Sequence, residues 1–193
     1  MNTKDKILQA ALALYNQEGI RSVTTRHIAA VMGISAGNLH YHFKHTEDII
    51  LALFEQLVVA YDQIVQDMAI HTALNMEDLK QCIDSSFRLI EQYRFIFINF
   101  VELGSWIPSI RASYQNLVAR REQEFLRMFT DMVDDGVFRA DIPPAVQKGI
   151  LRHLFLISDF WISSNELREQ LRGDEALAVY RQDVLSIFTP YLK

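Results

Sequence analysis

The 193-residue chain has one cysteine, four prolines and seven glycines, although half of its residues are hydrophobic. The single thiol, Cys82, cannot form a disulfide framework or a four-thiolate metal site, and this usage is typical of a reducing compartment. Apolar runs such as 95–101 end at a charge well short of the roughly 18 residues of a membrane span. The N-terminus also lacks the apolar core of a secretion signal. These absences predict a cytoplasmic protein with no membrane partner.

Apolar residues recur with the 3.6-residue period of α-helices along nearly the whole chain, and no segment predicts a strand. The segment 93–103 either extends the helix before it or starts a new one. We predict an all-α fold with a three-helix N-terminal domain at 1–46 and a helical C-terminal domain at 47–193. The expected longer helices span 3–18, 46–68, 75–92, 108–135, 144–168 and 174–192, and two short helices lie between the first two of these. Thr46, with Glu47 and Asp48, is expected to cap the helix at 46–68.

The segment TTRHIAAVMGISAGNLHYHFK, residues 24–44, predicts two short helices joined by a four-residue turn. Thr24 and Ser35 are suited to cap the two helices, and Gly33 is suited to end the first one. Leu39 supplies an apolar contact between them. Together these features are typical of a helix-turn-helix.

The outer face of the second short helix is polar and has no evident packing role. With about 100° per residue and Leu39 pointing inward, Gly37, Tyr41 and Lys44 point outward, and Asn38 flanks them. So short and polar a helix has low intrinsic helix propensity and little surface to bury. Its exposed groups can instead meet base edges and phosphates in a DNA major groove.

Charge is distributed unevenly along the chain. Residues 1–45 hold five Lys and Arg against two Asp and Glu, a charge of +3, so the remainder carries −8. A basic end beside an acidic remainder hints at nucleic-acid binding.

The run TTRHIAAVMGISAGNLHYHFKHTEDII resembles the DNA-binding segment of the TetR/AcrR family of transcriptional regulators. That resemblance implies an all-helical, homodimeric one-component regulator with a variable C-terminal ligand-binding and dimerisation domain. Three residues depart from the family pattern, His40, Ala36 and Thr46, and they leave the operator sequence open. The matching positions are Thr24, Arg26, Ile28, Ala29, Gly33, Ile34, Ser35, Gly37, Leu39, His42 and Phe43.

Different DNA contacts suit different residues of this segment. Arg26 and Asn38 can each form a bidentate contact with a base, while Lys44 suits phosphate. His40 can contact guanine or phosphate, and Gly37 allows close approach of the backbone. Capping alone is an equally good role for the helix-start hydroxyls. The candidate DNA-binding residues are Thr24, Thr25, Arg26, Ser35, Gly37, Asn38, His40, Tyr41 and Lys44.

The last two expected helices predict a dimer interface. Apolar residues in 144–168 cover most of the helix circumference, which exceeds the needs of one buried face. The helix at 174–192 adds another apolar stripe. Two such helices from each subunit can pack as a four-helix interface, and a two-fold axis sets two recognition helices about 34 Å apart on DNA. The alternative is a large core within one subunit.

A small-molecule site is expected to be an apolar pocket with a few polar anchors. Aromatic residues at helical spacing more often form a plain core, whereas Asn99 and Asp159 interrupt apolar runs and need a partner. That partner can be a backbone carbonyl or a neighbouring arginine. The ligand-binding candidates are Phe97, Asn99, Phe100, Glu102, Trp106, Phe129, Phe155 and Asp159.

These features predict a transcriptional regulator that binds a palindromic DNA operator as a homodimer under control of an unknown small-molecule effector. The family resemblance implies that this regulator is a repressor. The alternative is a helical protein–protein interaction module without DNA binding, which would show no salt-dependent DNA affinity. No enzyme is expected, because the chain lacks catalytic spacings and a glycine-rich phosphate loop. No cofactor or metal is expected, since His40 and His42 point about 200° apart on a helix.

Overall fold

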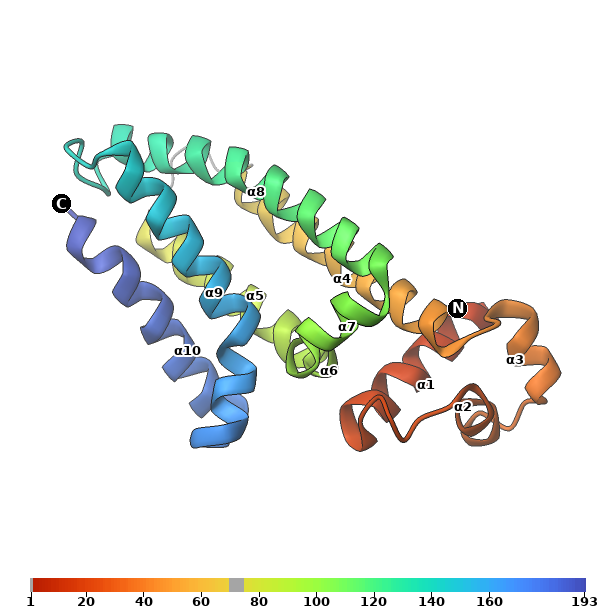
Figure 1. Cartoon of the computed structure of the whole chain (residues 1–193). Helices are drawn as coiled ribbons and strands as arrows, with labels where there is room; N and C mark the ends of the chain where they lie inside the picture. Colours follow the sequence, from red (N-terminus) through yellow and green to blue (C-terminus); the bar gives the residue numbers. More distant parts are fainter. Residues whose placement is uncertain (1, 70–74) are drawn as a thin grey trace. The chain divides into compact units, whose positions relative to one another are not determined.

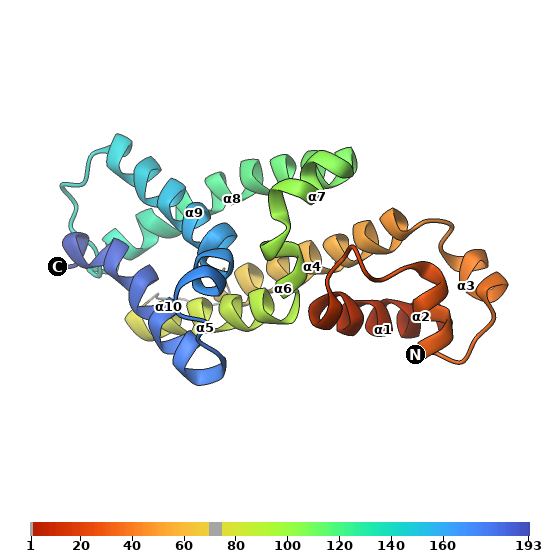
Figure 2. The ribbon, with the colours of Figure 1, turned by 60° about the horizontal axis from the view of Figure 1, so that its bottom comes forward.

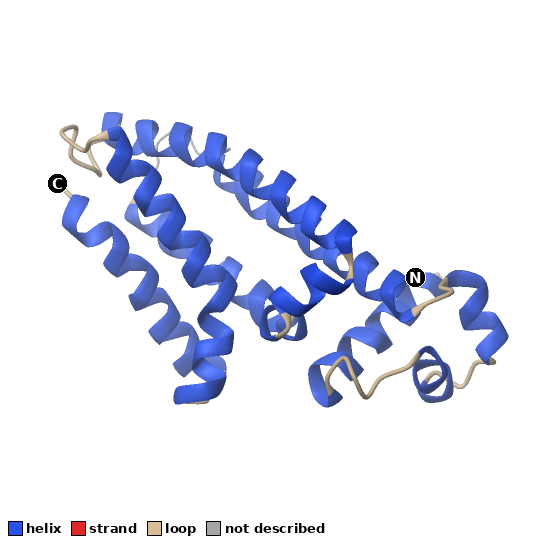
Figure 3. Ribbon diagram, viewed as in Figure 1, coloured by secondary structure: helices blue, strands red, loops and turns tan. Residues whose placement is uncertain are grey.

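The computed structural model describes residues 2–69 and 75–193 (Figure 1). Within these ranges no strand forms (Figure 3). The β-type pairing there is a single bridge between Phe138 and Leu192. The prediction of an all-α fold is confirmed. The helices are α1 (Thr3–Glu18), α2 (Thr25–Val31), α3 (Ala36–His42), α4 (Thr46–Ala69), α5 (Met76–Gln92), α6 (Arg94–Ile98), α7 (Phe100–Trp106), α8 (Pro108–Asp134), α9 (Pro144–Arg168) and α10 (Gly173–Phe188).

Local side-chain chemistry sets the ends of α1 where the sequence predicts them. At its start, Asn2 and Asp5 form a capping box in which each side chain accepts the backbone N–H of the other. At its end, Gly19 has a φ of 80° and its N–H donates to the carbonyl of Tyr15 at 3.1 Å. A positive φ is a conformation that glycine adopts at little cost.

The start of α4 and the end of the last helix differ most from the prediction. Thr46 is the first residue of α4 and not its cap. The N-terminus of α4 is instead closed by Asp48, whose carboxylate accepts the N–H of His45 at 2.9 Å. The last helix ends at Phe188 and continues as a short 3₁₀ turn, because Pro190 has no N–H to extend the α-helical ladder.

The segment after α5 starts again as two short helices, which decides between the two predicted possibilities. The helix breaks first at Tyr93, between α5 and α6, where φ is −103° and ψ is 32°. A second break, between α6 and α7, lies at Asn99, whose φ of −110° and ψ of 20° are not helical. Its side-chain amide donates to the carbonyl of Phe95 at 2.7 Å. A short polar side chain that bonds to nearby backbone favours such a break.

The chain folds as two compact units, which are described separately. The first comprises Met1–Val58 and Tyr93–Ser113, and the second comprises Val59–Gln92 and Tyr114–Lys193. The functional boundary expected after residue 46 lies inside the first unit and stays a prediction.

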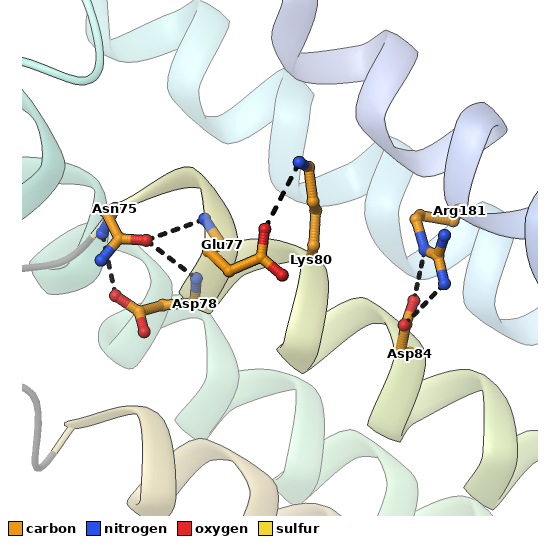
Figure 4. Close-up of polar contacts among 6 residues, drawn as sticks. All are labelled: Asn75, Glu77, Asp78, Lys80, Asp84 and Arg181. Carbon is orange, nitrogen blue, oxygen red and sulfur yellow. Dashed lines mark hydrogen bonds and ion pairs between the residues drawn. The ribbon is translucent and has the colours of Figure 1, made fainter.

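In the second unit, α10 packs against α5 and α9, and α5 also contacts α9 (Figure 2). Both ends of the Arg181 guanidinium in α10 donate to Asp84 of α5, at 2.6 and 2.7 Å. Figure 4 shows this pair together with Asn75, which caps α5 by accepting the N–H of Asp78 at 3.1 Å. The bidentate pair fixes the register of α5 on α10.

Candidate nucleic-acid interface

The helix-turn-helix has the predicted local geometry, with a four-residue turn between α2 and α3 (Figure 1). Thr24 accepts the N–H of His27 at 3.2 Å, and Ser35 accepts the N–H of Asn38 at 3.1 Å. Gly33 in the turn has a φ of 66°. Both predicted caps are confirmed. Each capping hydroxyl still has its own hydrogen, which can donate to a phosphate oxygen.

The inner side of α3 is packed as predicted. Leu39 is 1% exposed and Phe43 is 4% exposed, while Ile28 of α2 is fully buried. The ammonium group of Lys4 lies 5.5 Å from the centre of the Phe43 ring, which ties α1 to the end of α3. These contacts fix the rotation of α3 and therefore decide which side chains remain outside.

The outer side of α3 is solvent-exposed, and this confirms the predicted orientation. Tyr41 is 85% exposed. His42 is half-buried and lies edge-on to Tyr41, as a packed residue would. Among the other candidates Thr25 is half-buried, and the exposed ones are Thr24, Arg26, Ser35, Gly37, Asn38, His40 and Lys44. Their role as DNA contacts stays a prediction.

The basic residues of this region fall into two groups. Arg21 donates to Glu102 at 3.0 Å, and His27 lies 3.7 Å from Glu18. The side chains of Arg26 and Lys44, by contrast, make no hydrogen bond or ion pair with any described residue, and the same holds for those of Asn38 and His40. The second group therefore leaves its donors and acceptors available to an external partner.

Gly37 has no structural role that the chain itself explains. A Cβ atom built there would meet Ser35 Oγ at 3.9 Å, an ordinary van der Waals contact, and the φ of Gly37 is not positive. Glycine within a helix costs about 0.5–1 kcal/mol relative to alanine. The packing of the described residues therefore does not require a glycine at this exposed position of α3.

In the first unit, α6 and α7 are attached to the helix-turn-helix through α1. The side chain of Asn16 accepts the backbone N–H of Phe95 at 2.9 Å, and the rings of Tyr15 and Phe95 lie 5.0 Å apart. The Arg21–Glu102 pair adds a second link. The sequence gives no signal for these contacts, because about 80 residues separate the partners along the chain.

Five of the predicted ligand residues belong to this first unit. Phe97 is buried and stacks on the half-buried Phe100 with ring centres 6.3 Å apart. Asn99 finds the backbone carbonyl that was one expected partner. Glu102 is exposed and pairs with Arg21, and Trp106 is also exposed.

The other three ligand candidates belong to the second unit. Phe129 is buried in a row of rings with Phe125 and Phe138, a packing typical of plain core. Phe155 is half-buried. Asp159 is buried, and the hydroxyl of Tyr114 donates to its carboxylate. The eight candidates are thus divided between the two units, and their role as ligand contacts stays a prediction.

The environment of Asp159 alters its chemistry. Burial raises the pKa of this carboxyl to about 6, against a smaller lowering by the hydrogen bond from Tyr114. Burial and the neighbouring carboxylate in turn raise the pKa of Tyr114. Sequence reasoning selected Asp159 as a buried polar group but missed Tyr114, which is 45 residues away.

Two other kinds of site are lacking in the described part of the chain. Over residues 2–69 and 75–193, no three His, Cys, Asp or Glu side chains are grouped so that they could hold a metal ion. None of the helices in those ranges is long and apolar enough to cross a membrane.

Two family models together match residues 7–193, which include the helix-turn-helix. Residues 7–53 match the model described as bacterial regulatory proteins of the tetR family, and residues 53–193 match the model described as bacterial transcriptional repressor. The curated repressor KstR2 of Mycobacterium tuberculosis is 25% identical over 182 residues, covering 91% of this chain and 90% of its own.

One further relative is similar over a short segment of the chain, and another is similar over its full length. The regulator QacR of Staphylococcus aureus is 43% identical over 53 residues, 28% of each chain. A TetR-family regulator from Marinobacter aquaeolei has a solved structure with a TM-score of 0.88 at 29% identity, covering 100% of this chain and 92% of that one. These relatives are regulators and not enzymes. The chain belongs to the TetR family of bacterial transcriptional regulators.

Proposed function

We propose that the protein is a repressor that binds a palindromic operator as a homodimer and changes its DNA affinity when a small effector binds. The observation that carries the DNA-binding part is the outer face of α3. This face is exposed, its polar side chains are unpaired within the described residues, and it includes a glycine that the fold does not require.

The side chains on this face divide by chemistry into two roles. Asn38 and Arg26 read bases, because an amide pairs with adenine and a guanidinium with guanine through two hydrogen bonds each. Lys44 and the capping hydroxyls of Thr24 and Ser35 bind phosphates and set the register of the protein on the duplex. Tyr41 and His40 add phosphate contacts at the edge of the groove, and Thr25 supports the start of α2.

The dimer forms through α9 and α10, the segments predicted at 144–168 and 174–192. Leu156, Phe160 and Leu167 are 52%, 40% and 87% exposed, and their spacing of four and seven residues places them on one stripe of α9. A stripe of large exposed apolar side chains marks an interaction surface. A second copy fits it best, because a two-fold axis also presents two α3 helices to a palindrome.

Helix α4 couples the effector to DNA binding. It runs without interruption from Thr46 to Ala69, so it belongs to both units. An effector that prefers one arrangement of α4 thereby biases the spacing of the two recognition helices. Residues 1–46 then act as the DNA-binding domain and 47–193 as the effector and dimerisation domain. The DNA target places the protein in the bacterial cytoplasm.

A binding selection with randomised duplex oligonucleotides tests this function. We expect enrichment of a palindrome whose half-sites are about one helical turn apart, or a multiple of it. Affinity for the selected duplex should fall steeply between about 50 and 200 mM salt. Failure to enrich any sequence, together with no binding at low salt, would favour the protein–protein interaction module instead.

A further inference from the structure

Lys4 lies on the buried face of α1 but is itself exposed. Ile7 and Leu8, three and four residues further along, are both buried. Residues at these spacings lie on the same face of a helix. Lys4 therefore stands where the face of α1 that packs against the rest of the first unit reaches the solvent.

The ammonium group of Lys4 lies at the end of α3. Its nitrogen is 5.5 Å from the centre of the Phe43 ring. Phe43 closes α3, since its N–H donates to the carbonyl of Leu39 at 2.9 Å, and Lys44 follows it directly. The ring contact therefore brings a lysine of α1 to the end of α3 that also carries Lys44.

The charge of Lys4 is not neutralised within the described residues, because its ammonium forms no hydrogen bond or ion pair with any of them. Two carboxylates close in sequence to Lys4 or to the end of α3 have backbone partners of their own. Asp5 accepts the N–H of Asn2 at 3.3 Å. Asp48 accepts the N–H of His45 at 2.9 Å. An aromatic ring attracts a cation but has no net charge, so the ammonium keeps its charge and its N–H donors.

The contact with Phe43 does not by itself call for a lysine. Phe43 is 4% exposed, and an apolar side chain could cover its ring equally well. A second positive charge at the end of α3 that carries Lys44 is unfavourable in the free protein, because like charges repel. The same charge becomes favourable when an anion binds there.

The width of the DNA groove determines what this ammonium can reach. An α-helix with its side chains is about 10–12 Å across, and the major groove of B-DNA is about 12 Å wide. When α3 occupies the groove, a group beside the end of the helix lies over the sugar-phosphate wall and not over the base edges. A lysine there binds phosphate as a point charge.

We propose that Lys4 binds an operator phosphate beside the end of α3, next to the phosphate bound by Lys44, and that the Phe43 ring holds its ammonium in place for this contact. The proposal rests on the proposed function, because it requires α3 in a major groove. A ring contact that already orders the side chain reduces the entropy lost when the phosphate binds. Lys4 then helps to set the register of the protein on the duplex without reading its sequence.

Anisotropy titrations of the selected operator between about 50 and 200 mM salt test the proposal, with full-length wild type and variants. Lys4→Met keeps an unbranched apolar stem against Phe43 and removes the charge. It should weaken binding by about tenfold, equally on operator variants with single-base changes, and reduce the salt dependence by about one ion per subunit. Lys4→Arg keeps the charge and the ring contact, so it should restore the salt dependence and bring the affinity to within about twofold of wild type.

Lys6→Met is the matched control. Lys6 is exposed on the same helix and has no ion pair with a described residue. Two residues turn an α-helix by about 200°, so Lys6 points away from the side of α1 that bears Lys4. Its replacement should change operator affinity by less than about twofold and leave the salt dependence as in wild type.

Two results would overturn the role of Lys4 while operator binding by the wild type stands. An unchanged salt dependence for Lys4→Met, even with a lower affinity, would leave Lys4 only its structural contact with Phe43. An equal reduction for Lys6→Met would assign the effect to the net charge of α1. Absence of binding to any duplex by the wild type at low salt would instead overturn the proposed function, and the role of Lys4 with it.

Discussion

The two units differ in where they hold polar groups that lack a counter-charge or a hydrogen-bond partner among the described residues. In the first unit, the side chains of Asn38 in α3 and of Lys44 just beyond it are exposed and make no hydrogen bond or ion pair with the described residues. In the second unit, Asp159 and the Tyr61 oxygen are buried. A duplex is too large to be enclosed and needs an exposed face, whereas a small ligand is bound most strongly where water is excluded. This difference agrees with the two partners of the proposed function, a DNA duplex and a small effector.

The largest effect is expected when the dimer surface is broken. Replacing Leu156 and Phe160 together by Glu puts charges on the exposed stripe of α9, so the chain should become monomeric. Operator affinity should fall about 100-fold or more, because two linked half-sites bind far better than one. Sedimentation and fluorescence anisotropy measure the two changes. Val59→Glu, at an exposed apolar position of α4, is the matched control and should keep both properties.

The buried carboxylate of the second unit should give a pH-dependent stability. Its folded pKa of about 6 lies above the 3.8 of a free carboxyl, so its contribution is present below pH 4 and is lost as the pH rises through 6. Relative to wild type, Asp159→Asn should therefore gain about 2–3 kcal/mol of unfolding free energy between pH 4 and pH 7. Urea unfolding at several pH values measures it.

Asp174→Asn removes an exposed carboxylate from the same unit and serves as the control. A stability difference between Asp159→Asn and wild type that is the same at pH 4 and pH 7 would contradict the assigned burial. Tyr61, Tyr114 and Tyr180 do not titrate in this range, because their pKa values are raised.

Two substitutions on α3 should separate reading of bases from binding of phosphates. Asn38→Ala should cost about 1–3 kcal/mol on the selected operator and relax the preference at one base pair of each half-site. Lys44→Ala should weaken all duplexes evenly and reduce the salt dependence by about one ion per subunit. Affinities for single-base operator variants at several salt concentrations distinguish them. Equal losses on all sequences for both variants would remove Asn38 from base reading.

The smallest effects are expected from the two glycines of the helix-turn-helix. Gly37→Ala should stabilise the free protein by about 0.5–1 kcal/mol, since the space is open and the helix gains propensity, yet it should weaken operator binding. Gly33→Ala should destabilise the protein by about 1–2 kcal/mol, because its φ is 66°. Thermal unfolding with and without operator measures both. Tighter operator binding by the Gly37 variant would contradict close backbone approach.

The sequence predicted most of what depends on neighbouring residues. The bounds of α1 and α9, the caps at Thr24 and Ser35, and the buried side of α3 follow from helical periodicity and capping chemistry, which act over a few residues. The start of α4 at Thr46 and the end of the last helix before Pro190 differ from the predicted ends by about one helical turn or less. Several residues near a helix end can cap it, so its exact position is hard to predict.

Contacts between distant segments could not be predicted in the same way. The Arg21–Glu102 pair and the Tyr114–Asp159 hydrogen bond join residues that are 81 and 45 positions apart. Such contacts depend on how helices pack, and no local pattern encodes the packing. For the same reason, the sequence could mark Asp159 as unusual but could not identify its neighbours.

The measurement that tests the central claim most directly is the anisotropy titration of the selected operator against a copy with about five extra base pairs between its half-sites. That insertion turns one half-site by half a helical turn and should prevent a symmetrical pair of α3 helices from reaching both. We predict two chains per intact operator and a loss of affinity of about 100-fold for the lengthened one. Equal affinity for the two duplexes, or one chain per operator, would contradict the claim.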